Sequence, residues 1–319
     1  MHEATPQTSD LRLPDLKPEV QSYIAQLKKS LFVIYAKYEV KNRNELAVKV
    51  REGKVDTKDS DKVIELLKVI NECGKQDKIV GNELAERILA VEKRTLSEFF
   101  KRPIDVPPLP DEITRERIKQ WEKQKLELHY LPEVDMSNER HLKNWKKQPK
   151  LGLLRSTDLP NDVMWLTGCW VLVDARPKPN YKGGSEYEDD QDFLGPVLEE
   201  SRKMDLIANF ENPQSRYAIS SEELEKPEVV AAFASACGLE PEQISLPRMI
   251  EFNVIGNIHH PEWGETDCGE WFADGYETGQ WQWRLNGGCV DQGGLSYVYT
   301  SDYQDRSGKY GFRILGRFK

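Results

Sequence analysis

The amino-acid sequence predicts an α+β fold in which a helical N-terminal part precedes a domain rich in β-strands. In the first hundred residues, apolar side chains recur at steps of three and four, the period of one helix face. From about Leu151, short apolar runs bounded by turn residues replace this pattern. Tryptophan is absent before Trp121, and glycine becomes dense after Gly264. We therefore expect two structural regimes along the chain.

Residues 1–103 are expected to form a small bundle of three helices. The first carries an apolar stripe from Val20 to Tyr38, and the second runs from Asp59 to about Cys73. The third carries Leu84, Leu96 and Phe100 on one face and stops before Pro103. These helices are interpreted as a segment that tethers or oligomerises the domain after them.

Residues 104–150 are expected to form a linker followed by a charged helix. The proline-rich stretch 104–112 favours extended and stiff backbone. A highly charged pattern with helical spacing follows it from Ile113 to Leu131. We interpret the whole segment as a spacer between the helical part and a domain covering residues 151–319.

The first half of that domain mixes strands and helices. The run 170–175 predicts a strand, whereas the acidic stretch 181–192 has no periodicity and is interpreted as a solvated loop in preference to a calcium site. A helix is predicted over 221–239, with Ser220 or Ser221 as its N-cap and Gly238 at its end. The apolar segment 246–258 fits a buried strand or a short helix, and hairpins are expected after it.

Composition and charge limit the classes of function that this chain can have. The net charge of −9 repels phosphate groups, so nucleic acid is not expected as a partner. No apolar run approaches the length of about 18 residues that a spanning helix needs, and no membrane insertion is expected. The N-terminal residues 1–19 lack the features of a signal peptide, which favours the cytoplasm and leaves surface or virion display open. The five scattered cysteines favour a reducing compartment over a disulfide framework.

The C-terminal stretch 269–319 has the chemistry of a recognition surface. Glycines and apolar residues such as Gly287, Leu295 and Phe312 interrupt a set dominated by Tyr, Ser, Asp, Thr and Asn. Tyrosine supplies rigid contact area, and the small polar side chains supply adaptable hydrogen bonds. Paired glycines permit the tight turns that present such side chains. Trp281 and Trp283 lie two apart in an expected hairpin and are candidates for flanking contacts, whereas Trp263 and Trp271 are expected to be structural.

The same stretches resemble the variable proteins of diversity-generating retroelements, which display a hypervariable surface on a C-type-lectin fold. The resemblance rests on LPRMIEFNVIGNIHHPEWGET (246–266), EWF (270–272), RLNGGCVDQGGLSYV (284–298) and GFRIL (311–315), and it extends over about 151–319. It implies a C-type-lectin-like domain that binds a protein or glycan ligand without catalysis. The segment 279–285 is longer than the turn usual in that family.

The resemblance also supplies a filter for variable positions. Mutagenic reverse transcription changes template adenines, so an Asn codon ending in a pyrimidine can become a codon for Tyr, Ser, Asp, Thr, Gly, Cys or His, but not for Trp, Gln, Glu or Lys. The positions that pass and fall between framework residues are Asn286, Cys289, Asp291, Ser296, Tyr297, Tyr299, Thr300, Ser301, Tyr303, Asp305, Ser307 and Tyr310.

Two other function classes remain as alternatives. Formylglycine-generating enzymes and related oxidoreductases share the lectin-like fold and use a cysteine pair, for which Cys268 and Cys289 are the candidates here. A structural adaptor role would instead leave the Tyr-rich positions buried. Motifs of other common enzyme classes are absent from the sequence, so no catalytic residue is assigned.

No cofactor or metal ligand is assigned either. Asp267, Glu270 and Asp274 are candidates for a structural cation, but their spacing alone does not support one. His259 and His260 are adjacent, so their side chains should diverge, and structural roles are favoured for both. Arg313 is expected to be a framework residue whose guanidinium pairs with a carboxylate or with carbonyl groups.

Overall fold

The computed structural model describes residues 84–151, 159–176 and 192–318, together with a few positions between Val33 and Val63. The chain divides into two compact units, one comprising Met1–Arg87 with Glu112–Ile118, the other Ile88–Asp111 with Lys119–Lys319. The expected helices over 20–38 and 59–73 lie almost entirely outside the described residues. The third expected helix is confirmed, since residues 84–100 are helical and the helix ends before Pro103.

The first sheet of the larger unit has the strand order β1-β2-β8-β3, with every neighbouring pair antiparallel. Its strands are β1 (Leu126–Asp135), β2 (Trp165–Asp174), β3 (Ile244–Ser245) and β8 (Leu315–Phe318). The strand expected over 170–175 is confirmed as the buried second half of β2. Val171 and Val173 on one face of β2 and Trp170 and Leu172 on the other are all buried, so both faces of this half of the strand are covered.

The expectation of one charged helix from Ile113 to Leu131 is wrong in its second half. The helix α4 covers only Arg115–Lys123, and Lys125 adopts a left-handed φ of 56°, which ends it. The following residues form β1, which pairs with β2 from Leu126↔Asp174 to Asp135↔Trp165. Part of the segment interpreted as a spacer therefore belongs to the sheet, and the domain begins well before residue 151.

Further residues of the expected linker are built into the larger unit. Ile104 and Val106 are buried in the proline-rich stretch, and Trp145 is buried with its indole N–H donated to Asn253 Oδ1 at 2.8 Å. A short 3₁₀ helix, η2 (Met136–Glu139), follows β1 and is capped by Asp135. This segment is a structural part of the domain rather than a spacer.

The second sheet has the order β6-β5-β4-β7, in which β4 and β7 are parallel and the other pairs antiparallel. Its strands are β4 (Gly269–Thr278), β5 (Trp281–Gly287), β6 (Val298–Asp302) and β7 (Tyr310–Gly311). The expected hairpin is confirmed, because Thr278 pairs with Trp281 across a two-residue turn in which Gly279 has a φ of 62°. The long 279–285 segment is thus a tight turn and a strand.

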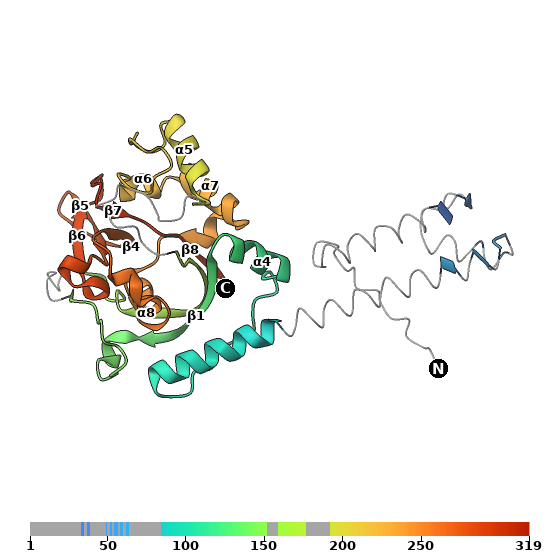
Figure 1. Ribbon diagram of the computed structural model, residues 1–319, viewed down its shortest axis with the longest axis horizontal. Helices are drawn as coiled ribbons and strands as arrows, with labels where there is room; N and C mark the ends of the chain where they lie inside the picture. The colour runs from blue at the N-terminus through green and yellow to red at the C-terminus, as the bar shows by residue number, and fades with distance from the viewer. Residues whose placement is uncertain are drawn as a thin grey trace. The chain divides into compact units, whose positions relative to one another are not determined.

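The helical prediction over 221–239 is confirmed with one interruption. Helix α6 (Ser221–Leu224) begins with Ser220 in a capping box with Glu223, and α7 (Pro227–Cys237) ends at Gly238, whose φ of 67° is left-handed. Pro227 separates the two helices because it cannot donate a backbone hydrogen bond. These helices and α5 (Gly195–Lys203) lie together on one side of the unit (Figure 1).

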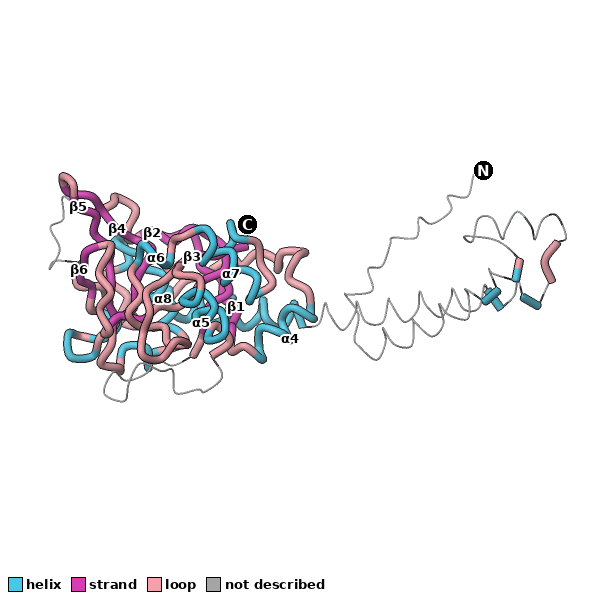
Figure 2. The backbone as a smooth tube through the Cα atoms, turned by 90° about the horizontal axis from the view of Figure 1, so that it is seen from above, coloured by secondary structure: helices cyan, strands magenta, loops and turns pink. Residues whose placement is uncertain are grey.

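Helix α8 (Met249–Ile258) settles the open choice for residues 246–258 in favour of a helix. Its residues from Met249 to Gly256 are all buried, and it contacts β2 of the first sheet and both β4 and β5 of the second. Figure 2 shows α8 between the strands of the two sheets. A short 3₁₀ helix, η6 (Pro261–Gly264), follows it.

The remaining short elements are η5 (Pro241–Gln243), η7 (Val290–Gln292) and η8 (Gly294–Ser296). The α+β class is therefore confirmed, since helices and largely antiparallel sheets combine in one unit. Within the described ranges, no helix is long and apolar enough to cross a membrane.

Candidate functional site

Four of the residues expected to form a fixed framework are fully buried. Trp263, Trp271, Phe312 and Arg313 each have no exposed side-chain surface. The Arg313 guanidinium binds Glu270 with two hydrogen bonds of 2.7 Å, donates to the carbonyl of Asp174, and lies 3.6 Å from the centre of the Trp263 ring. The prediction that Arg313 pairs with a carboxylate and with carbonyl groups is confirmed.

The twelve expected variable positions divide by burial. Three are buried, namely Asn286, Ser296 and Ser301, and Asn286 Nδ2 donates to Ser301 Oγ at 3.0 Å. For these three, the expectation of a ligand-facing side chain is wrong, because they pack within the second sheet and the η8 turn. The other nine are partly or fully exposed: Cys289, Asp291, Tyr297, Tyr299, Thr300, Tyr303, Asp305, Ser307 and Tyr310.

Tyrosines form the aromatic part of the exposed set. Tyr299 on β6 is 49% exposed, and its ring stacks on that of Tyr297 with centroids 6.2 Å apart and planes 9° apart. Burial, together with the neighbouring Tyr310, raises the pKa of Tyr297 to about 12. The Tyr310 ring meets the buried Trp271 edge to face at 4.9 Å. The tyrosines are thus held by ring contacts while each stays partly exposed.

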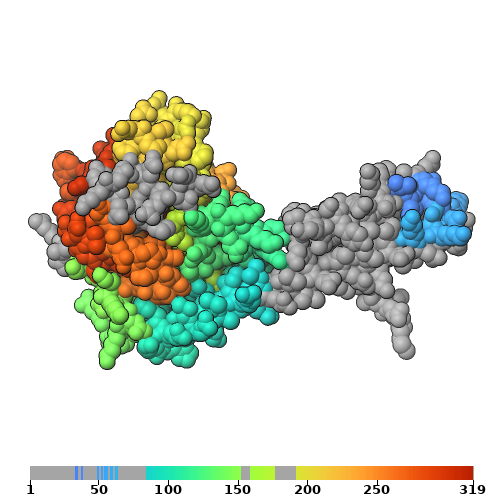
Figure 3. Space-filling model, viewed as in Figure 1, coloured from blue at the N-terminus to red at the C-terminus, as the bar shows by residue number. Residues whose placement is uncertain are grey.

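The tip of the β4–β5 hairpin carries the most exposed aromatic side chain of this region. Trp281 is 54% exposed, and in Figure 3 the atoms of the C-terminal residues, coloured orange to red, gather on one side of the molecule. Two adjoining hollows of about 300 and 380 Å³ lie beside the hairpin, one lined by Trp283 and the other by Trp281. Both hollows share Glu277, Gln282 and Tyr303 as lining residues.

Tyr303 is fixed between charged partners in the shared wall. Its hydroxyl donates to Glu225 Oε2 at 2.7 Å, and the Arg284 guanidinium lies 5.1 Å from the centre of its ring. Arg284 itself donates to Glu225, to Ser221 Oγ at 3.2 Å and to the Ala273 carbonyl at 2.7 Å. Burial and the Glu225 carboxylate raise the pKa of Tyr303 to about 12. The phenol therefore stays neutral at physiological pH and keeps its hydrogen bond.

Sequence reasoning identified the aromatic members of this site but missed the acidic ones. Glu222 belongs to α6 and Glu225 caps its end, and both line the hollows, although they precede Gly279 at the hairpin turn by more than fifty positions. Within the hairpin sequence, Trp281 and Trp283 were the only residues that indicated a binding site. The site has a wall formed by α6 and β5 and an accessible rim, by which we mean the nine accessible filter positions from Cys289 to Tyr310.

Two of the three acidic cation candidates, Glu270 and Asp274, are engaged elsewhere. Glu270 binds Arg313, and Asp274 accepts from Arg248 Nε at 3.0 Å and from the Met249 backbone at 2.6 Å. Of the acidic stretch 181–192, only Asp192 is described, and it binds the Arg216 guanidinium. Neither arrangement gathers oxygens around a cation.

The two cysteines of the enzyme alternative occupy different surroundings. Cys268 is buried and receives the Tyr217 hydroxyl at 3.1 Å, whereas Cys289 is partly exposed and lies 3.3 Å from the Asp267 carbonyl oxygen. Among the described cysteines, Cys169, Cys237, Cys268 and Cys289, none forms a disulfide bond.

The histidines at the end of α8 lie near a third histidine that sequence reasoning did not select. The rings of His259 and His260 diverge, with centroids 6.4 Å apart, as their adjacency predicts. His259 stacks on His129 of β1 at 3.9 Å, and His260 stacks on Trp263 at 4.6 Å. Burial and the neighbouring imidazoles lower the pKa of His259 to about 3, so this ring is neutral at pH 7.

Comparison with protein-family models, curated proteins and solved structures found no significant match to this chain.

Proposed function

We propose that this chain is a non-catalytic binding protein with a C-type-lectin-like domain, and that its accessible rim from Cys289 to Tyr310 varies through retroelement mutagenesis. The ligand-contacting surface comprises the β4–β5 hairpin tip, the two hollows beside it and the accessible positions of residues 289–310. A protein or a glycan is the ligand class, and the N-terminal segment tethers or oligomerises the display domain.

The observation that carries this proposal is the separation of framework from accessible positions within one short stretch. Between Asn286 and Ile314, the expected framework residues Leu295, Val298 and Phe312 are at most 3% exposed. Most of the positions that pass the codon filter are accessible between them. Since exposed substitutions usually change stability by under about 0.5 kcal/mol, such a surface tolerates extensive replacement. Buried positions do not tolerate such replacement.

The chemistry of the surface favours recognition. Tyrosine and tryptophan supply large contact area at small entropic cost and are frequent binding hot spots. Trp281 and Tyr299 offer such area, while the hollows add the carboxylates of Glu225 and Glu277 as directional acceptors. Because Trp281 fails the codon filter, we assign it a constant anchoring role beside the variable rim.

A display library tests this proposal. Randomising the nine accessible filter positions to Tyr, Ser, Asp, Thr, Gly, Cys, His and Asn should yield mostly folded proteins and binders to unrelated immobilised targets such as lysozyme and avidin. In each selected binder, Trp281→Ala should weaken binding at least roughly tenfold, the equivalent of 1.4 kcal/mol. Trp165→Ala is the matched control, since Trp165 is 43% exposed but lies at the start of β2.

The control library randomises an equal number of exposed positions elsewhere on the same unit. Equal yields of binders from both libraries would contradict a dedicated surface. Loss of folding throughout the first library would show instead that the nine positions are structural, as the adaptor alternative requires.

A further inference from the structure

Three potential ligand side chains converge from segments far apart in the sequence. Glu127 and His129 are two apart on β1, so both side chains project from the same face of that strand. His260 comes from the turn between α8 and η6. One ligand atom from each of the three residues lies within 4.8 Å of the others.

The distances fit a common bound ion. Glu127 Oε2 lies 3.3 Å from His129 Nε2 and 3.3 Å from His260 Nε2. Zinc bonds of about 2.0–2.1 Å in a tetrahedron separate neighbouring ligand atoms by about 3.3 Å. The distances from the carboxylate oxygen to the two imidazole nitrogens therefore match the spacing of tetrahedral coordination, and the two nitrogens lie within 4.8 Å of each other.

The two imidazole Nε2 atoms have the Glu127 carboxylate as their polar neighbour, each at 3.3 Å. His129 is 6% exposed and His260 is 9% exposed, and the buried Nε2 atoms of both rings make no hydrogen bond of acceptable geometry. A buried polar atom left in this state costs free energy unless another group satisfies it. Both nitrogens face the Glu127 carboxylate, so a cation between them would satisfy all three groups.

The opposite nitrogen of each ring is held by a second carboxylate. His129 Nδ1 lies 3.1 Å from Glu92 Oε1, and His260 Nδ1 lies 3.0 Å from Glu262 Oε1. When Nδ1 of a neutral imidazole donates its proton to a carboxylate, Nε2 carries the lone pair that binds a metal. Metal-binding histidines commonly have such a carboxylate behind them, which fixes the tautomer and the ring orientation.

The surroundings fix these groups further and leave a route to them. Glu92 is 4% exposed and also accepts the Tyr130 backbone N–H at 3.1 Å through its other oxygen. The His260 ring packs flat on Trp263, with planes 7° apart. Glu127 is the accessible ligand, because 49% of its side-chain surface is exposed. An ion can therefore enter from the Glu127 side.

We propose that Glu127, His129 and His260 bind a divalent transition-metal ion of the zinc class, with Glu92 and Glu262 as positioning residues behind the two histidines. Two imidazoles and one carboxylate are a ligand set suited to zinc, and three protein ligands leave a fourth position for water or another small ligand. The site lies at the first sheet and does not depend on the proposed ligand-binding surface.

Metal titration of the purified full-length chain tests this proposal. After chelator treatment and dialysis, the chain is titrated with ZnCl₂ by calorimetry and with CoCl₂ by visible absorption. The expected results are one ion per chain and intense d–d bands of tetrahedral cobalt, without sulfur-to-cobalt charge transfer. Glu127→Gln and His260→Ala should each weaken zinc binding by at least tenfold, and Glu92→Gln should weaken it by about 10–100-fold.

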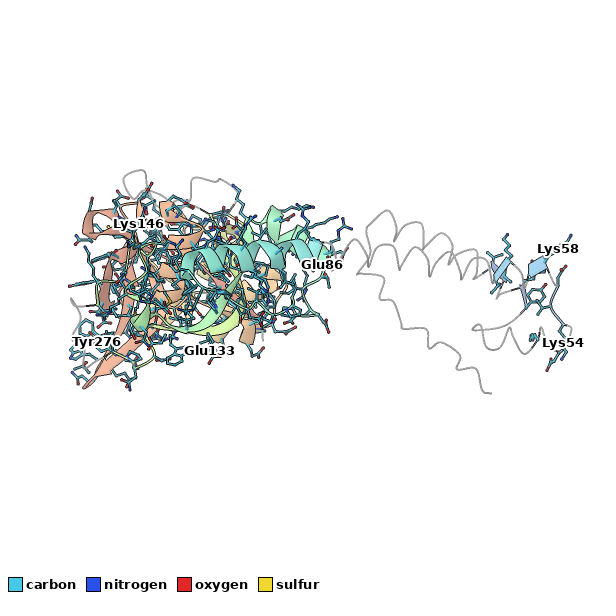
Figure 4. All side chains as sticks on the ribbon, turned by 90° about the horizontal axis from the view of Figure 1, so that it is seen from below. Lys54, Lys58, Glu86, Glu133, Lys146 and Tyr276 are labelled. Carbon is cyan, nitrogen blue, oxygen red and sulfur yellow. The ribbon has the colours of Figure 1, made fainter. Side chains whose placement is uncertain are left out.

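Matched variants separate loss of the site from general effects. Glu133→Gln changes another exposed carboxylate of β1, labelled in Figure 4, and His141→Ala removes a largely exposed histidine. Both should bind zinc as the wild type does, and the circular dichroism of every variant should match the wild type. Absence of stoichiometric zinc binding would overturn the proposal, as would equal affinity in Glu127→Gln or cobalt spectra showing thiolate ligands.

Discussion

Replacing Phe312 by alanine tests the division between framework and surface. The Phe312 side chain is fully buried, stacks on Phe233 with ring centroids 5.4 Å apart, and lies 5.4 Å from the Arg216 guanidinium. Truncating a buried phenylalanine removes its transfer free energy and leaves a cavity, at a cost of about 3–5 kcal/mol. For a unit of this size, that loss lowers the melting temperature by about 6–20 °C.

Tyr299→Ala is the matched aromatic truncation on the accessible side. Tyr299 is 49% exposed and makes a stacking contact with Tyr297, so its removal should cost about 1 kcal/mol or less. Urea unfolding followed by tryptophan fluorescence is the assay. Every tryptophan of the chain lies at Trp121 or later, and therefore in the larger unit. A cost for Phe312→Ala similar to that for Tyr299→Ala would refute the assignment.

Three further predictions follow from individual contacts. Gly287→Ala should destabilise the unit by about 1–3 kcal/mol in urea unfolding, because its Cβ would lie 2.1 Å from the Tyr297 carbonyl oxygen and the strands would have to separate; a neutral result would contradict this close approach. Glu225→Gln should lower the pKa of Tyr303 from about 12 towards 10.0, seen as earlier phenolate absorbance in a difference titration against Tyr303→Phe; an unchanged titration would show that burial alone sets the pKa. Burial raises the pKa of Asp192, but the Arg216 and Arg176 guanidinium groups outweigh burial and hold that pKa below its ordinary value of 3.8. The Asp192 carboxylate therefore stabilises the fold above pH 3.8, and this contribution is lost as the pH falls through the lowered pKa. Asp192→Asn should therefore destabilise the protein at pH 7, by on the order of 3 kcal/mol, and flatten the acid limb of its stability curve; parallel acid limbs in the two proteins would argue against this role.

Local signals predicted the elements whose ends are defined by neighbouring residues. Ser220 and Gly238 mark the beginning and end of the α6–α7 region through a side-chain cap and a left-handed backbone. The hairpin at Gly279 follows from a turn between alternating residues. Such features depend on contacts within a few positions, so the sequence displays them.

Other elements depend on partners far along the chain. The β1 strand continues a charged helical pattern, and its extended form is secured by pairing with β2, which begins thirty residues later. Ser301 is a small polar residue of the kind usually found on a surface, but it is buried beside Asn286. Glu127 and His129 meet His260 only because β1 and the end of α8 are neighbours in the fold. The spacing of residues in the sequence does not predict these long-range contacts.

Nucleotide sequencing of the locus tests most directly our proposal that this is a binding protein whose accessible rim is diversified. We expect a reverse transcriptase gene nearby and a near-copy of the codons for residues 265–319. The two copies should differ chiefly at template adenines, and the affected positions should coincide with the accessible set that includes Tyr299 and Tyr303. A locus without the near-copy, or with differences concentrated at buried positions such as Leu295 and Phe312, would contradict it.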